Sequence, residues 1–474
     1  TYPVKLEAAN DTAESFTNSE YAEAPIENEQ YKGMIRIVKV DANNPERLLP
    51  GAVFDVKNEA GKVLCSISTT EKGGESPLLP VGKYQVFERM QPAGFKFTDE
   101  VWNVEITKDS ESVITLTIEN EANEVTLKKT DLTDGKPVPG ATIEIYGENG
   151  KLYHKAQTDA SGEIYMREIP AGKYTWKETV CPDGYALNTE TFSFEVDKYG
   201  KVTGTTQMTD EPITLTITKM DTYTKQPFAG ISFTLKDSEG NTVTTKLTDK
   251  GYRVAAEDGE ETFKVDDKGY AEFRYLKAGK YTLIEDTPLG YIAEDEIAIE
   301  LTTAHSLSKP NALTVNNTPT AIRILKVDAT TNKPLTGAGF RIKIKDGLGF
   351  EALAFTRMED GSYFFDEDGK VMDLMVNGKG EITILGLPLG AVWIEESIVP
   401  EGYFPIAARK AEITKETSLD KPLAIKVENS KFVKLGMDSD WWEFPALIGA
   451  CLLACGGAVF FFIRRRKKIR KSEG

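Results

Sequence analysis

Hydrophobic and polar residues alternate along short stretches of this chain, and the same order of stretches occurs four times. The alternation has a period of two, as in a β-strand that is buried on one face only. Gly, Pro and Asp turns separate the stretches, and helical periodicity is nearly absent from them. The pattern predicts an all-β protein made of tandem immunoglobulin-like β-sandwich repeats.

The repeats set the expected domain organisation. We expect four units, at residues 34–123, 124–212, 213–319 and 320–430. Residues 1–33 contain Ile26-Glu27-Asn28-Glu29, which resembles the end of the first unit, so we interpret them as the remnant of a preceding repeat in a longer protein. Units 3 and 4 contain insertions, around residues 245–270 and 345–378, which we expect to be hairpins or loops.

Three strands of each unit carry a polar residue at an equivalent place. The first strand ends in Lys-x-Asp, with Lys39, Lys129, Lys219 or Lys326. A later strand begins at Gly and contains Glu88, Glu178, Glu285 or Glu396. The last strand ends in Asn120, Asp210, Asn317 or Asn429. The alternation places all of these residues on the apolar face, so we expect each unit to bury one Lys, one Glu and one Asn or Asp.

Such a buried triple has two interpretations. The first is a structural ion pair between Lys and Glu that an amide bridges, although buried ion pairs contribute little to stability. The second is a reactive group. Burial lowers the pKa of a Lys, which makes it a neutral nucleophile, and raises the pKa of a Glu, which can then donate a proton. Attack on the side-chain carbonyl releases ammonia or water and leaves an isopeptide bond. We predict the reaction, because the bond removes the buried ammonium and the triple recurs in all four units.

The chain resembles the B-type (Cna-B or SpaA-like) domains of collagen adhesins and pilins on Gram-positive bacteria. The resemblance covers about residues 34–430 and uses Lys-x-Asp, the Glu of Tyr-x-x-x-Glu-x-x-x-Pro-x-Gly-Tyr, and the terminal Asn, in that order. It implies a Glu-promoted cross-link in each unit, namely Lys39–Asn120, Lys129–Asp210 as the Lys–Asp variant, Lys219–Asn317 and Lys326–Asn429. Two units depart from the motif: Pro288 follows Glu285 by three residues instead of four, and Val392 replaces the Tyr.

A charge-free stretch, residues 444–463, predicts a transmembrane helix, because twenty residues of helix cover about 30 Å. The basic tail at residues 464–474 places the C-terminus in the cytoplasm and the repeats outside the cell. We therefore expect the lipid bilayer as a partner and a single-pass membrane location. The linker at residues 431–443 contains no LPxTG motif, so the sequence does not support attachment to the cell wall by sortase.

Composition narrows the function classes. The net charge of −17 is that of an acidic chain, which argues against nucleic acid as a partner. The spacing of the four cysteines matches no disulfide framework or metal-binding motif. The two histidines, His154 and His305, are far apart in the sequence. Asp366-Glu367-Asp368-Gly369 lacks the ligand spacing of a calcium loop. We expect no cofactor, no metal and no enzymatic activity beyond a single intramolecular cross-linking turnover.

The favoured hypothesis is a structural stalk of a membrane-anchored surface adhesin or pilin-related protein, stiffened by the cross-links. Host extracellular matrix would then be bound by a region N-terminal to Thr1. Two alternatives stay open. The repeats themselves bind a host matrix protein or glycan, for instance through Tyr363, Phe364 and Phe365 of the last insertion, unless these aromatic residues pack on their own sandwich. The other alternative is a minor pilus subunit.

Overall fold

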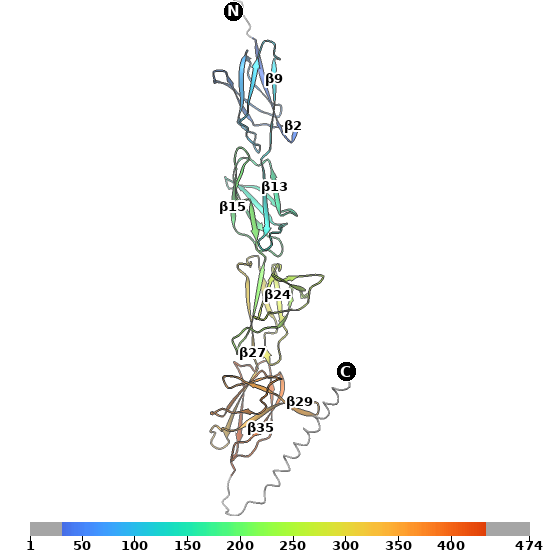
Figure 1. Cartoon of the computed structure of the whole chain (residues 1–474), viewed down its shortest axis with the longest axis vertical. Coiled ribbons are helices and arrows are strands. Elements are labelled where there is room, and N and C mark those ends of the chain that lie inside the picture. Colours follow the sequence, from blue (N-terminus) through green and yellow to red (C-terminus); the bar gives the residue numbers. More distant parts are fainter. Residues whose placement is uncertain (1–30, 433–474) are drawn as a thin grey trace, which may run out of the picture. The chain divides into compact units, whose positions relative to one another are not determined.

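The computed structural model describes residues 31–432, and every regular element in this range is a β-strand (Figure 1). The predicted all-β architecture is therefore confirmed. The described residues pack as two compact units. The first contains the chain up to Asp221, Lys225–Asp286 and Glu294–Asn316, and the second contains Thr222–Thr224, Thr287–Ala293 and the chain from Asn317.

The predicted transmembrane segment, the basic tail and residues 1–30 lie outside the described residues. Between residues 31 and 432 no helix is long and apolar enough to cross a membrane.

Repeat 1 is a sandwich of two sheets. In one sheet β1 (Lys32–Asp41) pairs with β2 (Asn44–Leu48), β5 (Gly74–Glu75), β6 (Leu79–Pro80) and β9 (Val113–Asn120). The other has the order β4 (Val63–Ser68), β3 (Val53–Asn58), β7 (Gly82–Met90), β8 (Val101–Ile106). Alternate residues of both sheets, such as Ile37 and Val86, are fully buried between them, as the alternation of the sequence requires.

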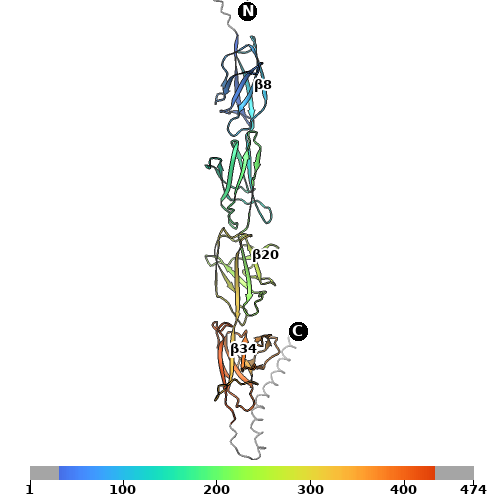
Figure 2. The ribbon, with the colours of Figure 1, turned by 90° about the vertical axis from the view of Figure 1, so that its left-hand side faces the viewer.

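Repeat 2 has the same two layers (Figure 2). Its first sheet has the order β13 (Glu163–Arg167), β10 (Glu124–Asp131), β17 (Gln207–Asp210). Its second has the order β12 (Leu152–Gln157), β11 (Thr142–Gly147), β14 (Gly172–Val180), β15 (Thr191–Val196), β16 (Val202–Gly204). Trp176 on β14 is the largest fully buried side chain of this core.

Repeat 3 adds an inserted hairpin. One sheet has the order β20 (Thr245–Thr248), β21 (Gly251–Val254), β23 (Tyr270–Arg274), β18 (Thr214–Asp221), β27 (Asn311–Pro319). The other has the order β22 (Phe263–Lys264), β19 (Ser232–Lys236), β24 (Gly279–Glu285), β26 (Ile297–Leu301). In the second compact unit, β25 (Tyr291–Ile292) pairs with the end of β27.

Repeat 4 also contains an inserted hairpin. One sheet has the order β31 (Phe355–Arg357), β32 (Tyr363–Phe365), β34 (Glu381–Leu385), β28 (Ala321–Asp328), β37 (Leu423–Asn429). The other has the order β30 (Gly349–Ala352), β29 (Gly339–Asp346), β35 (Gly390–Ile398), β36 (Arg409–Ile413), and β33 (Leu374–Met375) also pairs with β29. Both insertions noted in the sequence thus contain hairpins, β20–β21 and β31–β32.

The first and last strands of a repeat are parallel neighbours, and this pairing positions the site. The aligned residues at the strand ends are Asp41 with Asn120, Asp131 with Asp210, and Asp328 with Asn429. The Lys lies two residues before each Asp. Because residues two apart on a strand share a face, the Lys and the terminal Asn or Asp both point into the sandwich.

Candidate functional site

The four lysines of the Lys-x-Asp strands are buried in the cores of their repeats. Their exposed fractions are 1% for Lys39 and Lys129 and 0% for Lys219 and Lys326. The Glu side chains of β7, β14, β24 and β35 are 0–1% exposed. Asn120, Asp210, Asn317 and Asn429 are also buried. Lysines are almost never fully buried without a partner, so the neighbours of each ammonium decide what the site does.

In repeat 1 the three predicted residues meet. The Nζ of Lys39 donates a hydrogen bond to Oδ1 of Asn120 and lies 3.6 Å from Oε1 of Glu88. The Nδ2 of Asn120 donates to the same Oε1 at 3.3 Å and to the carbonyl oxygen of Lys96 at 2.8 Å. Glu88 therefore lies beside both the amine and the amide nitrogen.

In repeat 2 an Asp takes the place of the Asn. The Nζ of Lys129 contacts Oδ1 of Asp210, lies 3.1 Å from Oε1 of Glu178 and lies 3.1 Å from the Sδ of Met208. Burial raises the pKa of Asp210 to about 7, and the Lys129 ammonium opposes this shift. The nearby Glu178 carboxylate contributes to the raised pKa, and with a pKa of about 7 Asp210 is partly protonated at neutral pH.

Repeat 4 shows the tightest arrangement around the Glu. The Nζ of Lys326 donates to Oδ1 of Asn429 and lies 2.8 Å from Oε1 of Glu396. The Nδ2 of Asn429 donates to both carboxylate oxygens of Glu396, at 2.9 and 3.0 Å. The replacement of the motif Tyr by the buried Val392 does not displace the three residues.

In repeat 3 the first compact unit contains two of the three residues. The Nζ of Lys219 lies 3.7 Å from Oε2 of Glu285. Asn317 is fully buried and belongs to the second compact unit. The Lys219–Asn317 pair therefore stays a prediction.

Burial lowers the pKa of three of the four lysines, Lys39, Lys219 and Lys326. Burial lowers the pKa of Lys39 and of Lys219 from 10.5 to about 8, although the carboxylates of Glu88 and Glu285 raise it. Burial also lowers the pKa of Lys326, against the opposing effect of Glu396. A Lys with a pKa near 8 has a substantial neutral fraction at neutral to weakly alkaline pH, and the neutral amine is the nucleophile.

The sequence did not indicate the backbone amide that holds Glu88, Glu178 and Glu396 in place. The second carboxylate oxygen accepts a hydrogen bond from a backbone amide ten residues further along, from Thr98, Asn188 or Ile406. The signal was present as a constant spacing, but only the fold shows that the chain returns to the Glu there. Aromatic rings also line the site: the Nζ of Lys39 lies 5.6 Å from the ring centre of Phe54, and that of Lys326 lies 5.8 Å from Phe340.

The aromatic residues of the last insertion pack inside the protein. Tyr363 is 3% exposed and belongs to the core of repeat 4, and Phe365 packs against Phe355 at a ring distance of 6.2 Å. Asp366 accepts a hydrogen bond from the Asp368 amide, which closes a turn. Within residues 31–432 no group of three His, Cys, Asp or Glu side chains could hold a metal ion.

A comparison with protein families assigns the repeats. The chain matches the SpaA model, a prealbumin-like fold domain, at residues 33–122, 123–212, 213–312 and 320–431. The sandwiches are thus described as prealbumin-like, where the sequence analysis expected an immunoglobulin-like arrangement.

Curated relatives are surface proteins of Gram-positive bacteria. Serine-aspartate repeat-containing protein D of Staphylococcus aureus (strain Newman) is 26% identical over 165 residues, which are 33% of this chain and 12% of that protein. The trypsin-resistant surface T6 protein of Streptococcus pyogenes serotype M6 is 32% identical over 87 residues, which are 18% of this chain and 15% of that protein. The chain spans only a small part of the length of these relatives.

Solved structures that resemble the chain match it with low TM-scores. The Bacillus anthracis TIE protein is 30% identical, with a TM-score of 0.32, and the match covers 60% of this chain and 50% of that one. The shaft pilin SpaA from Lactobacillus rhamnosus GG is 18% identical, with a TM-score of 0.26, and the match covers 47% and 99%. Because these scores are low, the assignment depends on the family match. Since that match covers four stretches that make up most of the chain, the protein belongs to the SpaA family of prealbumin-like domains that occur in Gram-positive surface proteins.

Proposed function

We propose that each repeat closes an isopeptide bond between its first and last strands, and that the chain is a covalently braced stalk of a surface adhesin or pilin-related protein. The observation that carries the proposal is the contact of a buried Lys amine with the side-chain oxygen of Asn or Asp, next to a buried Glu, in repeats 1, 2 and 4.

The reaction needs one proton acceptor and one proton donor, and the Glu supplies both. Glu88 takes a proton from the Lys39 ammonium, which leaves a neutral amine and a neutral acid in an apolar site. The amine attacks Cγ of Asn120. The Glu then protonates the leaving Nδ2, to which it is already hydrogen-bonded, and takes back the proton of the attacking nitrogen. One C–N bond forms, one breaks, and ammonia leaves. In repeat 2 the protonated Asp210 loses water.

The bond has a mechanical consequence because it joins parallel neighbouring strands. The loops closed between the joined residues span 81 residues in repeats 1 and 2 and 103 residues in repeat 4. By analogy with disulfide loops, each closure stabilises its repeat by about 4–5 kcal/mol. A pulling force that enters through one strand leaves through the bond to the other, so the loop is not extended.

The location belongs to the same proposal. The charge-free segment at residues 444–463 and the basic tail after it support a single-pass membrane anchor, with the repeats outside the cell. The relatives from Staphylococcus aureus and Streptococcus pyogenes support a surface location. A direct matrix-binding or glycan-binding role gains no support, because Tyr363 and Phe365 are used for packing.

Intact-mass measurement of the whole chain tests the bonds. We expect a loss of about 17 Da for each Lys–Asn bond and about 18 Da for the Lys–Asp bond, in total about 69 Da for four bonds. Glu88→Gln should restore about 17 Da of this loss. The matched control is Glu105→Gln, an exposed Glu on the neighbouring strand β8, which should leave the mass deficit unchanged. An unshifted mass of the unaltered chain would sink the cross-link proposal.

A further inference from the structure

The residues that link consecutive repeats are ordered parts of the structure. The linker residues Asn123, Ile213 and Thr320 are 0–1% exposed. Their amides donate to carbonyl oxygens of the preceding repeat, at Gly94, Gly184 and Gly290, over 2.8, 2.9 and 2.9 Å. Their own carbonyl oxygens accept from amides of the following repeat, at Glu168, Tyr275 and Gly386, over 2.8, 3.0 and 3.0 Å. One buried residue is thus bonded to both repeats at each joint.

The two sides of each joint are in close contact. Glu168, Tyr275 and Gly386 adopt left-handed backbone conformations, with φ of 64°, 67° and 76°. They lie against the Gly of the preceding Pro-x-Gly turn. A Cβ added to that Gly would approach a backbone oxygen of the left-handed residue to 2.3 Å at Gly94, 3.0 Å at Gly184 and 2.1 Å at Gly290. The joints are therefore tightly packed contacts.

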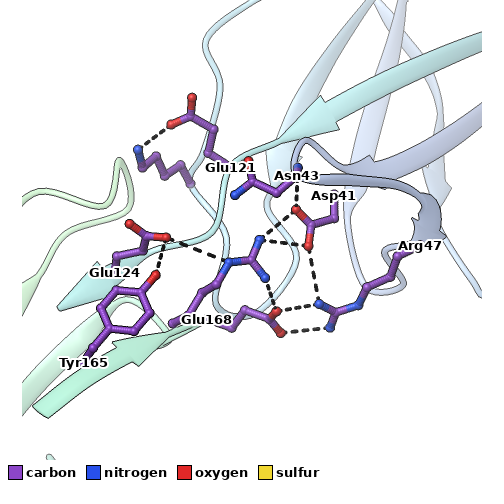
Figure 3. A network of polar contacts seen from close by, with 9 residues as sticks. Asp41, Asn43, Arg47, Glu121, Glu124, Tyr165 and Glu168 are labelled. Carbon is purple, nitrogen blue, oxygen red and sulfur yellow. Dashed lines mark hydrogen bonds and ion pairs between the residues drawn. The ribbon is translucent and has the colours of Figure 1, made fainter. Parts of the chain in front are cut away.

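Joint 1–2, between repeats 1 and 2, is held by ion pairs (Figure 3). Asp41 ends the Lys-x-Asp strand of repeat 1, and both of its carboxylate oxygens accept from Arg167 of repeat 2 at 2.9 Å. Arg47, on the next strand β2, donates to Oε2 of Glu168 at 2.8 Å, and Arg167 also donates to Glu168 at 2.7 Å. Two acids and two bases therefore alternate across the joint.

Joint 2–3, between repeats 2 and 3, lies at the equivalent place in the fold, but its side chains form hydrogen bonds of a tyrosine hydroxyl instead of ion pairs. The hydroxyl of Tyr275 donates to Oδ2 of Asp131 at 2.6 Å and lies 2.7 Å from Oγ1 of Thr133. The inserted hairpin β20–β21 supports this contact from both sides. Lys250 at its turn donates to the Thr133 carbonyl at 2.9 Å, and the Arg253 guanidinium lies 4.2 Å from the centre of the Tyr275 ring.

Joint 3–4, between repeats 3 and 4, lies within the second compact unit and is aromatic. Phe364, on the inserted hairpin β31–β32, packs against Tyr223 and Tyr291 at ring distances of 6.2 and 5.8 Å. The Tyr223 hydroxyl lies 2.9 Å from Oγ of Ser362. Tyr223 stands two residues after the Asp of its Lys-x-Asp strand, as Thr133 does in repeat 2.

We propose that the end of the Lys-x-Asp strand and the turn after it, in repeats 1, 2 and 3, form a docking site for the next repeat, and that the inserted hairpins of repeats 3 and 4 lock joints 2–3 and 3–4. The three joints use an ion-pair network, a phenol–carboxylate hydrogen bond and an aromatic cluster. Because each docking turn is complementary to one following repeat, the side chains fix the order of the repeats. The inference goes beyond the proposed stalk and does not require the cross-links.

Hydrogen exchange of the whole chain, followed by mass spectrometry, tests the joints. Two amides report directly across them: Phe97 donates to the Lys198 carbonyl of repeat 2 at 2.7 Å, and Leu187 donates to the Thr303 carbonyl of repeat 3 at 2.8 Å. Arg167→Met should speed exchange at Phe97 about tenfold and leave Leu187 unchanged. Tyr275→Phe should speed exchange at Leu187 and leave Phe97 unchanged.

Two further measurements distinguish the ion pairs of joint 1–2 from the contacts of the other two joints. Sodium chloride at about 1 M screens ion pairs over a few ångströms, so it should speed exchange at Phe97 and not at Leu187. Phe364→Ala should speed exchange at the Gly386 amide of joint 3–4 only. Arg89→Met is the matched control, because Arg89 pairs with Asp55 within repeat 1 and lies outside the joints.

The proposal is overturned if the joint amides exchange at the same rate in all variants, or if each variant speeds exchange throughout a repeat. The intact mass, measured on the same samples, reports the cross-links separately. A normal mass deficit with unchanged joint exchange would reject the docking sites alone, and a missing deficit with the expected exchange pattern would reject the cross-links alone.

Discussion

At the scale of the residue, the unusual feature is a lysine in a hydrophobic core. The Lys39 residue is 1% exposed, and the Glu88 carboxylate lies 3.6 Å from its Nζ. A buried ion pair of this kind contributes little net stability. Conversion of the amine into an amide would remove its charge, so the proposed cross-link would remove the cost of burying this residue.

The lowered pKa of Lys39 makes a prediction for a chain that cannot form the bond. In Asn120→Ala, Lys39 stays a free amine, with a pKa of about 8 when folded and 10.5 when unfolded. Between these values the unfolded state binds more protons, so the stability of repeat 1 should rise with pH from about 8 to about 10.5, by a total on the order of 3 kcal/mol. Below pH 8 the dependence on Lys39 should vanish.

Urea unfolding of repeat 1, followed at several pH values, measures this effect. The unaltered chain is the control, because in the proposed cross-linked form its Lys39 is an amide that does not titrate. Equal pH dependence in the two proteins would contradict the assignment of Lys39 as a titrating amine that the bond removes.

At the scale of the element, the parallel pairing of the first and last strands brings the reacting residues together. Asp41 lies opposite Asn120 in the β1–β9 register, so Lys39, two residues earlier, points to the same interior. The next residues of the chain form the docking turn, since the amide of Ala42 donates to the Asn120 carbonyl at 2.9 Å and Asp41 binds Arg167. The proposed cross-link and the joint are therefore adjacent on one strand.

A pair of glycines tests the close contact at the joint. Gly94→Ala should open joint 1–2, because its Cβ would lie 2.3 Å from the Glu168 carbonyl oxygen. Gly402 occupies the same turn of repeat 4 with a similar φ, 83° against 87°, and no atom lies within 4 Å of its added Cβ. Gly402→Ala thus carries the backbone strain without the clash. The expected result is faster exchange of the Phe97 amide in Gly94→Ala, without faster exchange in Gly402→Ala of the Phe404 amide, which lies two residues after Gly402 and donates to the Ser430 carbonyl. Faster exchange at both places would attribute the effect to strain.

At the scale of the whole molecule, four braced repeats in series should lengthen little under force. Each proposed bond would withhold the chain between its ends, which are 81 residues apart in repeat 1 and 103 residues apart in repeat 4. Single-molecule pulling of the unaltered chain should show no full unfolding step for a braced repeat. In Glu88→Gln, repeat 1 should add a step of about 270–290 Å in contour length, at 3.3–3.6 Å per residue.

The neighbouring exposed carboxylate supplies the comparison. Glu105→Gln should pull like the unaltered chain, because Glu105 lies on the outer face of β8. A long step for repeat 1 in the unaltered chain would show that its bond does not form and would remove the mechanical role proposed for it.

The sequence by itself determined the strands, the repeat order and which residues meet in the triads of repeats 1, 2 and 4. These follow from period-two alternation and constant spacing, which are local properties of the chain: parity alone placed Lys129, Glu178 and Asp210 on inward faces, and the structure brings all three together. Only the tertiary structure decided the joints. Arg167 and Asp41 are 126 residues apart and Tyr275 and Asp131 are 144 apart, and no periodicity connects such pairs. The sequence also predicted hairpins or loops for the two insertions, but only the fold places them against the preceding repeat. Packing between repeats depends on surface complementarity, which a one-dimensional pattern does not encode.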